Sequence, residues 1–261
     1  PLQRPTSMAD KEFFTPEEAA ERNYAVTLDQ PPRTGDVGSY NALWFDRGEV
    51  SSDRRTSLIV DPPDGRLPVK PETQEQAAAQ RDYRRAHPGD SWLDRSNWDR
   101  CITYHGVPPI STGYNNTYQI LQTADYVAIR VENIHDVRII PLDGRAQLDD
   151  GVRQWNGDSR GHWEGDTLVV ETTHFSGQAP WRGSGENLTL VEHFSRPEAN
   201  ILSYQVTFED PTTWERAWTA TLDLPKTEGL VYEYACHERN YGMENLLLGA
   251  RVLERNVAEA R

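Results

Sequence analysis

The sequence contains no long apolar run, and hydrophobic residues make up only 36% of its 261 residues. No window approaches the roughly 18 consecutive apolar residues that a membrane-spanning helix needs, so we expect no membrane span. Basic residues are outnumbered, because 27 Lys and Arg stand against 41 Asp and Glu and leave a formal net charge of -14. A surface this acidic repels phosphate backbones, so nucleic-acid binding is not expected.

Cysteine is scarce, and the two copies are Cys101 and Cys236. Their wide separation leaves no CxxC pair and excludes a zinc knuckle or a thioredoxin-type motif. The chain starts at Pro1 instead of Met, and removal of a secretory signal is the usual explanation. We therefore expect a periplasmic or secreted protein in which the two cysteines form a disulfide, with a catalytic thiol as the alternative.

Recognisable catalytic motifs are also missing. No Gly-x-Ser-x-Gly elbow is present, which argues against a serine hydrolase. The histidines show none of the close pairings that metal sites use, although His162 and His174 could approach each other across a tight hairpin. We predict neither a metal ion nor an organic cofactor.

Aromatic residues, in contrast, are plentiful, with 8 Trp, 11 Tyr and 6 Phe. Large rings bury much area per residue, so we expect a folded domain with polar loops. Beyond Cys101, apolar and β-branched segments alternate with polar turns, at 118–123, 126–132, 137–142, 161–175, 188–195, 201–209, 217–224 and 230–236. This spacing predicts an all-β fold, either an antiparallel β-barrel or a curved β-sandwich, over residues 101–261.

Residues 1–100 are expected to form a mostly irregular N-terminal arm that packs on the barrel and carries two short helices. Thr15-Pro16-Glu17-Glu18 combines a capping residue with Pro at the first helical position and predicts a helix over 16–26. Pro71 followed by good helix formers predicts a second helix over 71–86. A strand is expected at 57–60, and a further short helix near the C-terminus at 245–250.

The segment from Gly161 to Phe175 predicts a hairpin that turns at Glu164-Gly165-Asp166. In its second strand Leu168, Val170, Thr172 and His174 share one face, which is therefore not purely apolar. A mixed face of this kind is typical of a strand that lines a small ligand-binding barrel. The alternative is an ordinary antiparallel strand with one solvated face.

Several segments resemble a family of uncharacterised secreted bacterial proteins, namely 114–116, 132–145, 157–167, 209–211 and 233–238. The resemblance implies export and no particular activity. His162 stands where that family has Arg, and His174 where it has Asn. The hairpin is also similar to a lipocalin strand pair in which a Gly-x-Trp opens the barrel, which favours a lipocalin-like barrel over a sandwich.

Histidines and carboxylates near the strand ends are the candidates for general acid–base chemistry. Glu132 follows an apolar strand, where partial desolvation would raise its pKa, and His135 lies three residues further on. His174 is the second candidate, and His237, next to Cys236, is another. The alternative interpretation places Glu132, Asp136 and Arg138 in a surface or structural ion network, with His135 hydrogen-bonded at the end of the strand.

The residues expected to bind a substrate are mainly aromatic or polar: Tyr114, Asn116, Arg130, Trp155, Trp163, Thr172 and Tyr234. The sequence thus predicts a secreted, cofactor-independent enzyme of isomerase, lyase, cyclase or hydrolase type. Its substrate would be a hydrophobic or aromatic small molecule held in the barrel. The alternative is a noncatalytic extracytoplasmic small-molecule binding protein. Polar groups inside the cavity would favour the enzyme, and an apolar pocket with polar groups at its mouth would favour the binding protein.

Overall fold

The computed structural model describes residues 1–25, 48–104, 106–110, 113, 115–178, 181–238 and 240–259. Its elements, in chain order, are η1 (Thr6–Met8), α1 (Pro16–Ala25), β1 (Ile59–Asp61), α2 (Pro71–Ala86), η3 (Trp92–Asp94), β2 (Tyr118–Gln122), β3 (Tyr126–Val131), η4 (Asn133–His135), β4 (Val137–Pro141), β5 (Asp158–Glu164), β6 (Thr167–Thr173), β7 (Thr189–Glu198), β8 (Ile201–Glu209), β9 (Trp218–Pro225) and α3 (Tyr241–Glu259).

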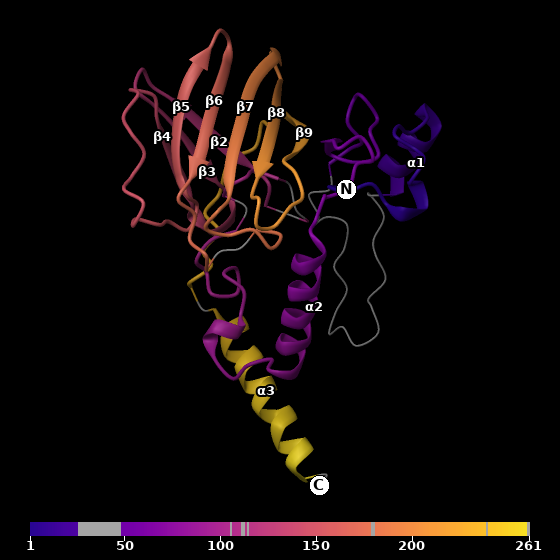
Figure 1. Ribbon diagram of the computed structural model, residues 1–261, viewed down its shortest axis with the longest axis vertical. Helices are drawn as coiled ribbons and strands as arrows, with labels where there is room; N and C mark the ends of the chain where they lie inside the picture. The colour runs from indigo at the N-terminus through magenta and orange to yellow at the C-terminus, as the bar shows by residue number, and fades with distance from the viewer. Residues whose placement is uncertain are drawn as a thin grey trace.

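The strands form two antiparallel sheets. The larger has six strands in the order β1-β9-β8-β7-β6-β5, and the smaller has three in the order β2-β3-β4 (Figure 1). Alternate residues of each strand point inward, so Val127 and Ile129 of β3 share one buried core with Val170 of β6 and Val206 of β8. The predicted antiparallel β architecture is confirmed.

The sheets do not close into the lipocalin-like barrel that the sequence favoured. Among the described residues, backbone pairing ends at β4 on one sheet and at β5 on the other. These two strands instead pack through Gly161, where an added Cβ would lie 2.8 Å from Ile140 Cγ2. Glycine allows this close approach, and the result is a sandwich with unpaired edges.

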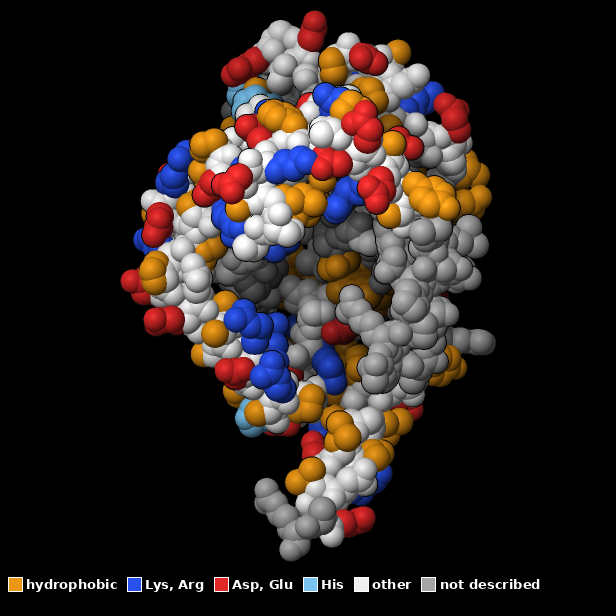
Figure 2. Space-filling model, turned by 90° about the vertical axis from the view of Figure 1, so that its right-hand side faces the viewer, with side chains coloured by type: hydrophobic (Ala, Val, Ile, Leu, Met, Phe, Trp, Pro, Cys, Tyr) orange, Lys and Arg blue, Asp and Glu red, His pale blue; other side chains and the backbone are white. Residues whose placement is uncertain are grey.

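The helices change the predicted all-β class to a mixed, mostly β fold. Both helices of the arm are present, at Pro16–Ala25 and Pro71–Ala86. The helix predicted at 245–250 is part of α3, which is 19 residues long. It extends away from the sheets, and Figures 1 and 2 show it as the lower projection of the molecule.

The strand predicted at 230–236 is wrong, because residues 226–236 have no regular secondary structure. The edge of β9 that such a strand would need is already occupied. There β1, from the N-terminal arm, pairs with β9 and sets Ile59 opposite Ala220. The other predicted strands are present with small shifts at their ends.

The predicted disulfide is confirmed. Cys101 and Cys236 are 135 residues apart and are joined by an S–S bond of 2.06 Å. The bond ties the irregular segment that precedes β2 to the segment that leads into α3. In the part of the chain that is described, no helix is both long enough and apolar enough to cross a membrane.

Candidate functional site

Aromatic rings fill much of the space between the sheets in which the sequence placed a ligand. Tyr204, Phe208, Trp214 and Trp218 are all at most 1% exposed. The rings of Phe208 and Trp218 are stacked, with centroids 3.9 Å apart and an interplanar angle of 5°. This part of the interior is therefore a packed core.

A buried ion pair joins the two sheets inside this core. The side chains of Arg138 on β4 and Glu192 on β7 are 4% and 0% exposed. The guanidinium binds the carboxylate in two places, with Nη1 donating to Oε1 at 3.0 Å and Nη2 donating to Oε2. Two opposite charges held this closely neutralise each other, which a buried charge requires.

Three hydroxyl groups complete this buried cluster. Tyr204 donates to Glu192 Oε1 at 2.8 Å. Arg138 donates to Ser159 Oγ at 2.8 Å from Nε, and to Thr172 Oγ1 at 2.6 Å from Nη2. Thr172, a predicted substrate-binding residue, is thus a fully buried partner of the ion pair.

Sequence reasoning named Arg138 in a possible ion network but missed Glu192 as its partner, although a signal for that pairing exists. Glu192 alternates with Leu190 and Phe194, which are buried on the same face of β7. A carboxylate at an apolar position of a period-two pattern must be paired, and an arginine at an equivalent position, Arg138, is its natural partner.

The turn that follows β3 is the second notable region, and it holds two of the predicted acid–base residues. Glu132 accepts hydrogen bonds from Asn115 Nδ2 and from the Thr117 backbone N–H, both at 3.2 Å. Asp136 accepts from Thr103 Oγ1 at 2.6 Å. These bonds tie the turn to the irregular segment before β2, which also contains Asn116.

The backbone of this turn is strained. Ile134 has φ 54° and ψ 34°, the left-handed region that a β-branched residue rarely adopts. Asn133 is completely buried, and among the described residues neither of its side-chain amide atoms has a hydrogen-bond partner. The side chain of His135 lies outside the described residues, as does Tyr114.

His174 lies away from the inner face that it was predicted to share with Leu168 and Val170. Strand β6 ends at Thr173, and His174 has φ 57°. Its Nδ1 lies 2.6 Å from Thr173 Oγ1 and 3.1 Å from Gln147 Oε1. Its Nε2 is 3.6 Å from Asp150 Oδ1, so the ring packs against the loop that precedes β5.

His162 and His174 do not approach each other. His162 lies opposite Val169 in the hairpin and is hydrogen-bonded to Glu164 at 3.1 Å, near the turn. His174 follows Thr173, which pairs with Asp158 at the other end of the same hairpin. The two rings are therefore separated by the length of the strands.

The remaining predicted residues are dispersed. Arg130 donates to the Val231 carbonyl at 3.3 Å. Trp155 and Trp163 are 37% and 44% exposed, and Trp163 lies at the hairpin turn, at the opposite end of the sheets from Glu132. His237 is exposed beside the disulfide.

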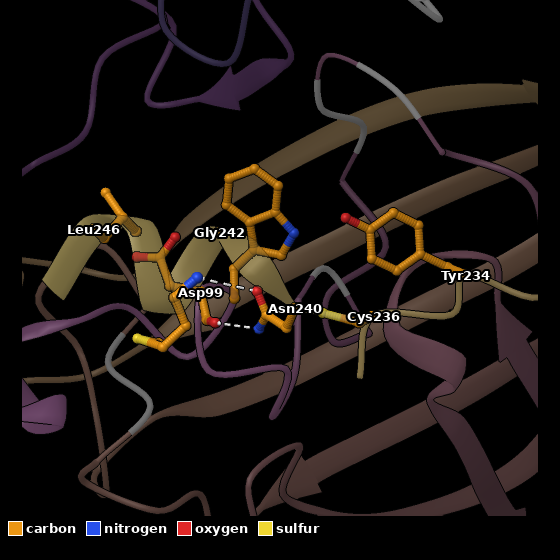
Figure 3. Close-up of a pocket in the computed structure, with 8 residues that line it drawn as sticks. Asp99, Tyr234, Cys236, Asn240, Gly242 and Leu246 are labelled. Atoms are coloured by element: carbon orange, nitrogen blue, oxygen red, sulfur yellow. Dashed lines mark hydrogen bonds between the residues drawn. The ribbon is translucent and has the colours of Figure 1, made fainter. Parts of the chain in front are cut away.

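A pocket of about 130 Å³ lies at the base of the sandwich, where α3 begins (Figure 3). It brings together residues that are far apart in sequence: Trp98, Asp99, Tyr234, Cys236, Asn240, Gly242, Met243 and Leu246. The disulfide between Cys236 and Cys101 holds the segment of Tyr234 close to the segment of Trp98 and Asp99. Of the predicted residues, Tyr234 and Cys236 line this pocket.

We call this pocket the base pocket. Further contacts fix its walls. The Trp98 ring stacks on Tyr104, with centroids 5.2 Å apart. Burial raises the pKa of the Tyr104 hydroxyl, and the nearby Tyr234 raises it further. Asn240 donates to the Asp99 carbonyl and accepts from the Met243 N–H, both at 3.2 Å, so it caps α3.

Sequence reasoning missed Trp98, Asp99, Asn240 and Met243. The signal available was the pair of Trp residues in the polar stretch 92–100. The base pocket and the strained turn are also connected, since Thr103 binds Asp136 while its neighbour Tyr104 stacks on Trp98. Both features therefore belong to one end of the sandwich.

Comparisons with known proteins give no assignment. No protein-family model, no curated protein and no solved structure matches this chain. The described residues also contain no group of three or more His, Cys, Asp or Glu side chains that could hold a metal ion.

Proposed function

We propose that this protein binds a small hydrophobic or aromatic molecule in the base pocket, without catalysing its conversion. The observation that supports this proposal is the makeup of the pocket. Trp98, Tyr234 and Met243 give it an apolar wall, and among the described residues that line it Asp99 supplies the one carboxylate. The buried charges of Arg138 and Glu192, in contrast, are paired with each other.

The size of the pocket limits the ligand. An apolar cavity of about 150 Å³ holds one benzene molecule, and the base pocket has about 130 Å³. The ligand, or the part of it that enters the pocket, is thus about as large as a six-membered ring. Tryptophan, tyrosine and methionine provide the dispersion contacts that such a group needs.

A periplasmic or secreted location is part of the same proposal. The Cys101–Cys236 disulfide persists in oxidising compartments and is uncommon in the cytosol. It also fixes the pocket, since Cys236 lines it and Cys101 follows Trp98 and Asp99 closely. An extracytoplasmic binding protein would keep this bond intact.

Ligand titration of the purified protein tests this proposal. Isothermal calorimetry with a panel of one-ring compounds, such as phenol, benzyl alcohol and benzylamine, should detect saturable binding. Trp98→Leu and Tyr234→Leu should each weaken that binding about tenfold, the loss of roughly 1.4 kcal/mol expected for one ring contact. Trp163→Leu is the matched control, because Trp163 is exposed at the far end of the sheets, and it should leave the affinity within twofold.

A saturable ligand whose affinity is unaffected by Trp98→Leu and Tyr234→Leu would place binding elsewhere and contradict this proposal. Absence of saturable binding across this panel and across the three choline-shaped probes described below would contradict it as well.

The predicted acid–base enzyme is the second candidate, and one observation favours it. Ile134 is held in a left-handed conformation beside the buried Asn133, and strain of this kind concentrates at functional sites. Glu132 and His135 would then act as the acid–base pair, without a cofactor. Mass spectrometry of each bound ligand after incubation distinguishes the candidates: conversion that is lost in Glu132→Gln and His135→Ala supports the enzyme, and unchanged ligand supports the binding protein.

A further inference from the structure

We infer that the ligand of the base pocket is a small organic cation, an ammonium group that carries alkyl substituents. This inference rests on the proposed binding function and specifies the class of ligand. It is argued from the charge of Asp99, from the two rings that line the same pocket and from the balance of these groups against the start of α3.

Asp99 supplies a negative charge that no cationic side chain among the described residues neutralises with an ion pair. Its carboxylate accepts from the Ser96 hydroxyl at 2.9 Å and from the Ser96 backbone N–H at 3.3 Å, which are neutral donors. The adjacent Arg100 is directed elsewhere, with its guanidinium 4.4 Å from the Trp92 ring and hydrogen-bonded to Asn97. In the described part of the chain, no cationic side chain lines the pocket with Asp99.

The rings of Trp98 and Tyr234 complement that carboxylate. In the view of Figure 3, the Tyr234 ring and Asp99 lie on opposite sides of Asn240, and Trp98 lines the same space. The face of an aromatic ring is negative, so it attracts a cation, and Trp is the strongest of these partners. Met243 adds a polarizable thioether to the wall. Rings together with one carboxylate suit a cation that also has apolar surface.

The N-terminus of α3 is the strongest argument for an anion, and it is outweighed. Gly242 and Met243 belong to the first turn of α3, where the helix dipole is equivalent to about +0.5 charge. Asn240 already accepts the Met243 N–H at 3.2 Å, and the full negative charge of Asp99 exceeds the partial positive charge. The formal net charge of -14 attracts cations further, whereas an anion would face Asp99 and both rings.

Three probes of the same shape test this inference on the full chain. Choline carries a trimethylammonium group, 3,3-dimethylbutan-1-ol is its neutral isostere, and 3,3-dimethylbutanoate is an anion of similar size. By calorimetry, choline should bind at least about tenfold more tightly than the neutral alcohol, and the anion should bind most weakly. The affinity for choline should also fall as the salt concentration is raised.

Asp99→Asn isolates the carboxylate while keeping its shape. This variant should weaken choline binding about tenfold and leave the affinity for the neutral alcohol within twofold. Asp166→Asn is the matched control, because it removes one charge from the exposed turn of the 161–175 hairpin and should leave both affinities unchanged. Circular dichroism would verify the fold of each variant, and the comparison of probes on the unaltered protein is independent of them.

The results that overturn the cation inference alone differ from the result that overturns both proposals. If the alcohol or the anion binds as tightly as choline, the cation inference is overturned while binding in the base pocket stands. If one-ring neutral compounds bind and choline does not, the cation inference is likewise overturned and binding in the base pocket stands. If neither these probes nor the one-ring panel binds, both proposals are overturned.

Discussion

Replacing Glu192 with glutamine should destabilise the protein severely, because Arg138 would remain buried and charged. The Arg138 side chain is 4% exposed, and arginine does not lose its proton in proteins. Removing one partner of a buried pair costs about 3–5 kcal/mol. That is a large share of the roughly 5–15 kcal/mol by which folded domains are stable.

Urea unfolding followed by circular dichroism measures this effect through the midpoint and slope of the transition. The double variant Arg138→Met with Glu192→Leu should be more stable than Glu192→Gln alone, since it leaves no charge in the core. Tyr204→Phe removes a neutral donor to a carboxylate and should cost roughly 1.5–3 kcal/mol. Burial raises the pKa of Tyr204 well above its ordinary value, and the charge of Glu192 adds to this, so the hydroxyl keeps its proton and remains a donor.

Glu209→Gln serves as the control, because Glu209 is exposed at the end of β8, and it should change stability by less than about 0.5 kcal/mol. The reasoning is refuted if Glu192→Gln costs less than about 1 kcal/mol. It is also refuted if the costs of Arg138→Met and Glu192→Leu simply add in the double variant, since the model requires strong coupling between the two side chains.

Three further outcomes are expected. Burial of Asp210 alone would raise its pKa, but hydrogen bonds from Ser184, Thr212 and Thr213 lower the pKa below its ordinary value. Asp210→Asn should therefore destabilise the protein at neutral pH and lose this effect as the pH falls through the lowered pKa, as urea titrations at several pH values would show. Gly161→Ala should cost roughly 1–3 kcal/mol because its Cβ would lie 2.8 Å from a methyl group, whereas Gly249→Ala, with no atom within 4 Å, should stabilise α3 by roughly 0.5–1 kcal/mol. Replacing both disulfide cysteines with serine should cost about 3–5 kcal/mol by unfolding assay, and intact mass after thiol blocking should find no free thiol in the native protein.

Elements that depend on local sequence could be predicted with small errors at their ends. Helix α2 spans 71–86 as expected, because Pro71 and the residues that follow it specify a helix without help from the rest of the chain. Leu168 and Val170 are buried on the inner face of β6, as their alternation indicates. Period and turn chemistry are properties of a few neighbouring residues.

Pairing of the strands could not be read in the same way. The edge of β9 is occupied by β1, from a segment about 160 residues earlier, so the alternating residues 230–236 have no sheet to join. The two sheets meet where Gly161 packs against Ile140, without backbone pairing between β4 and β5 among the described residues. Strand pairing and sheet closure depend on competition between distant segments, and no local sequence pattern records that competition.

The base pocket was not predicted as a site, although Tyr234 and Cys236, which line it, had been singled out from the sequence. Tyr234 and Cys236 belong to one short segment, and the disulfide was inferred from the cysteine count. Trp98 and Met243 meet them through docking of the first turn of α3, which depends on a helix that the sequence indicated to be much shorter. Of the two aromatic side chains in the pocket wall, Tyr234 was therefore singled out from the sequence and Trp98 was not.

The distribution of charge indicates where substitutions should change ligand binding and where they should change stability. Inside the sandwich, Arg138 and Glu192 satisfy each other and are sealed from solvent, so their replacement should change stability. At the base, the donors to the Asp99 carboxylate among the described residues are neutral, and Asp99 lines a pocket with Trp98 and Tyr234. Trp98, Asp99 and Tyr234 are partly exposed, so their replacement should change ligand affinity more than it changes the unfolding midpoint. The two groups of variants thus separate folding from binding in one protein.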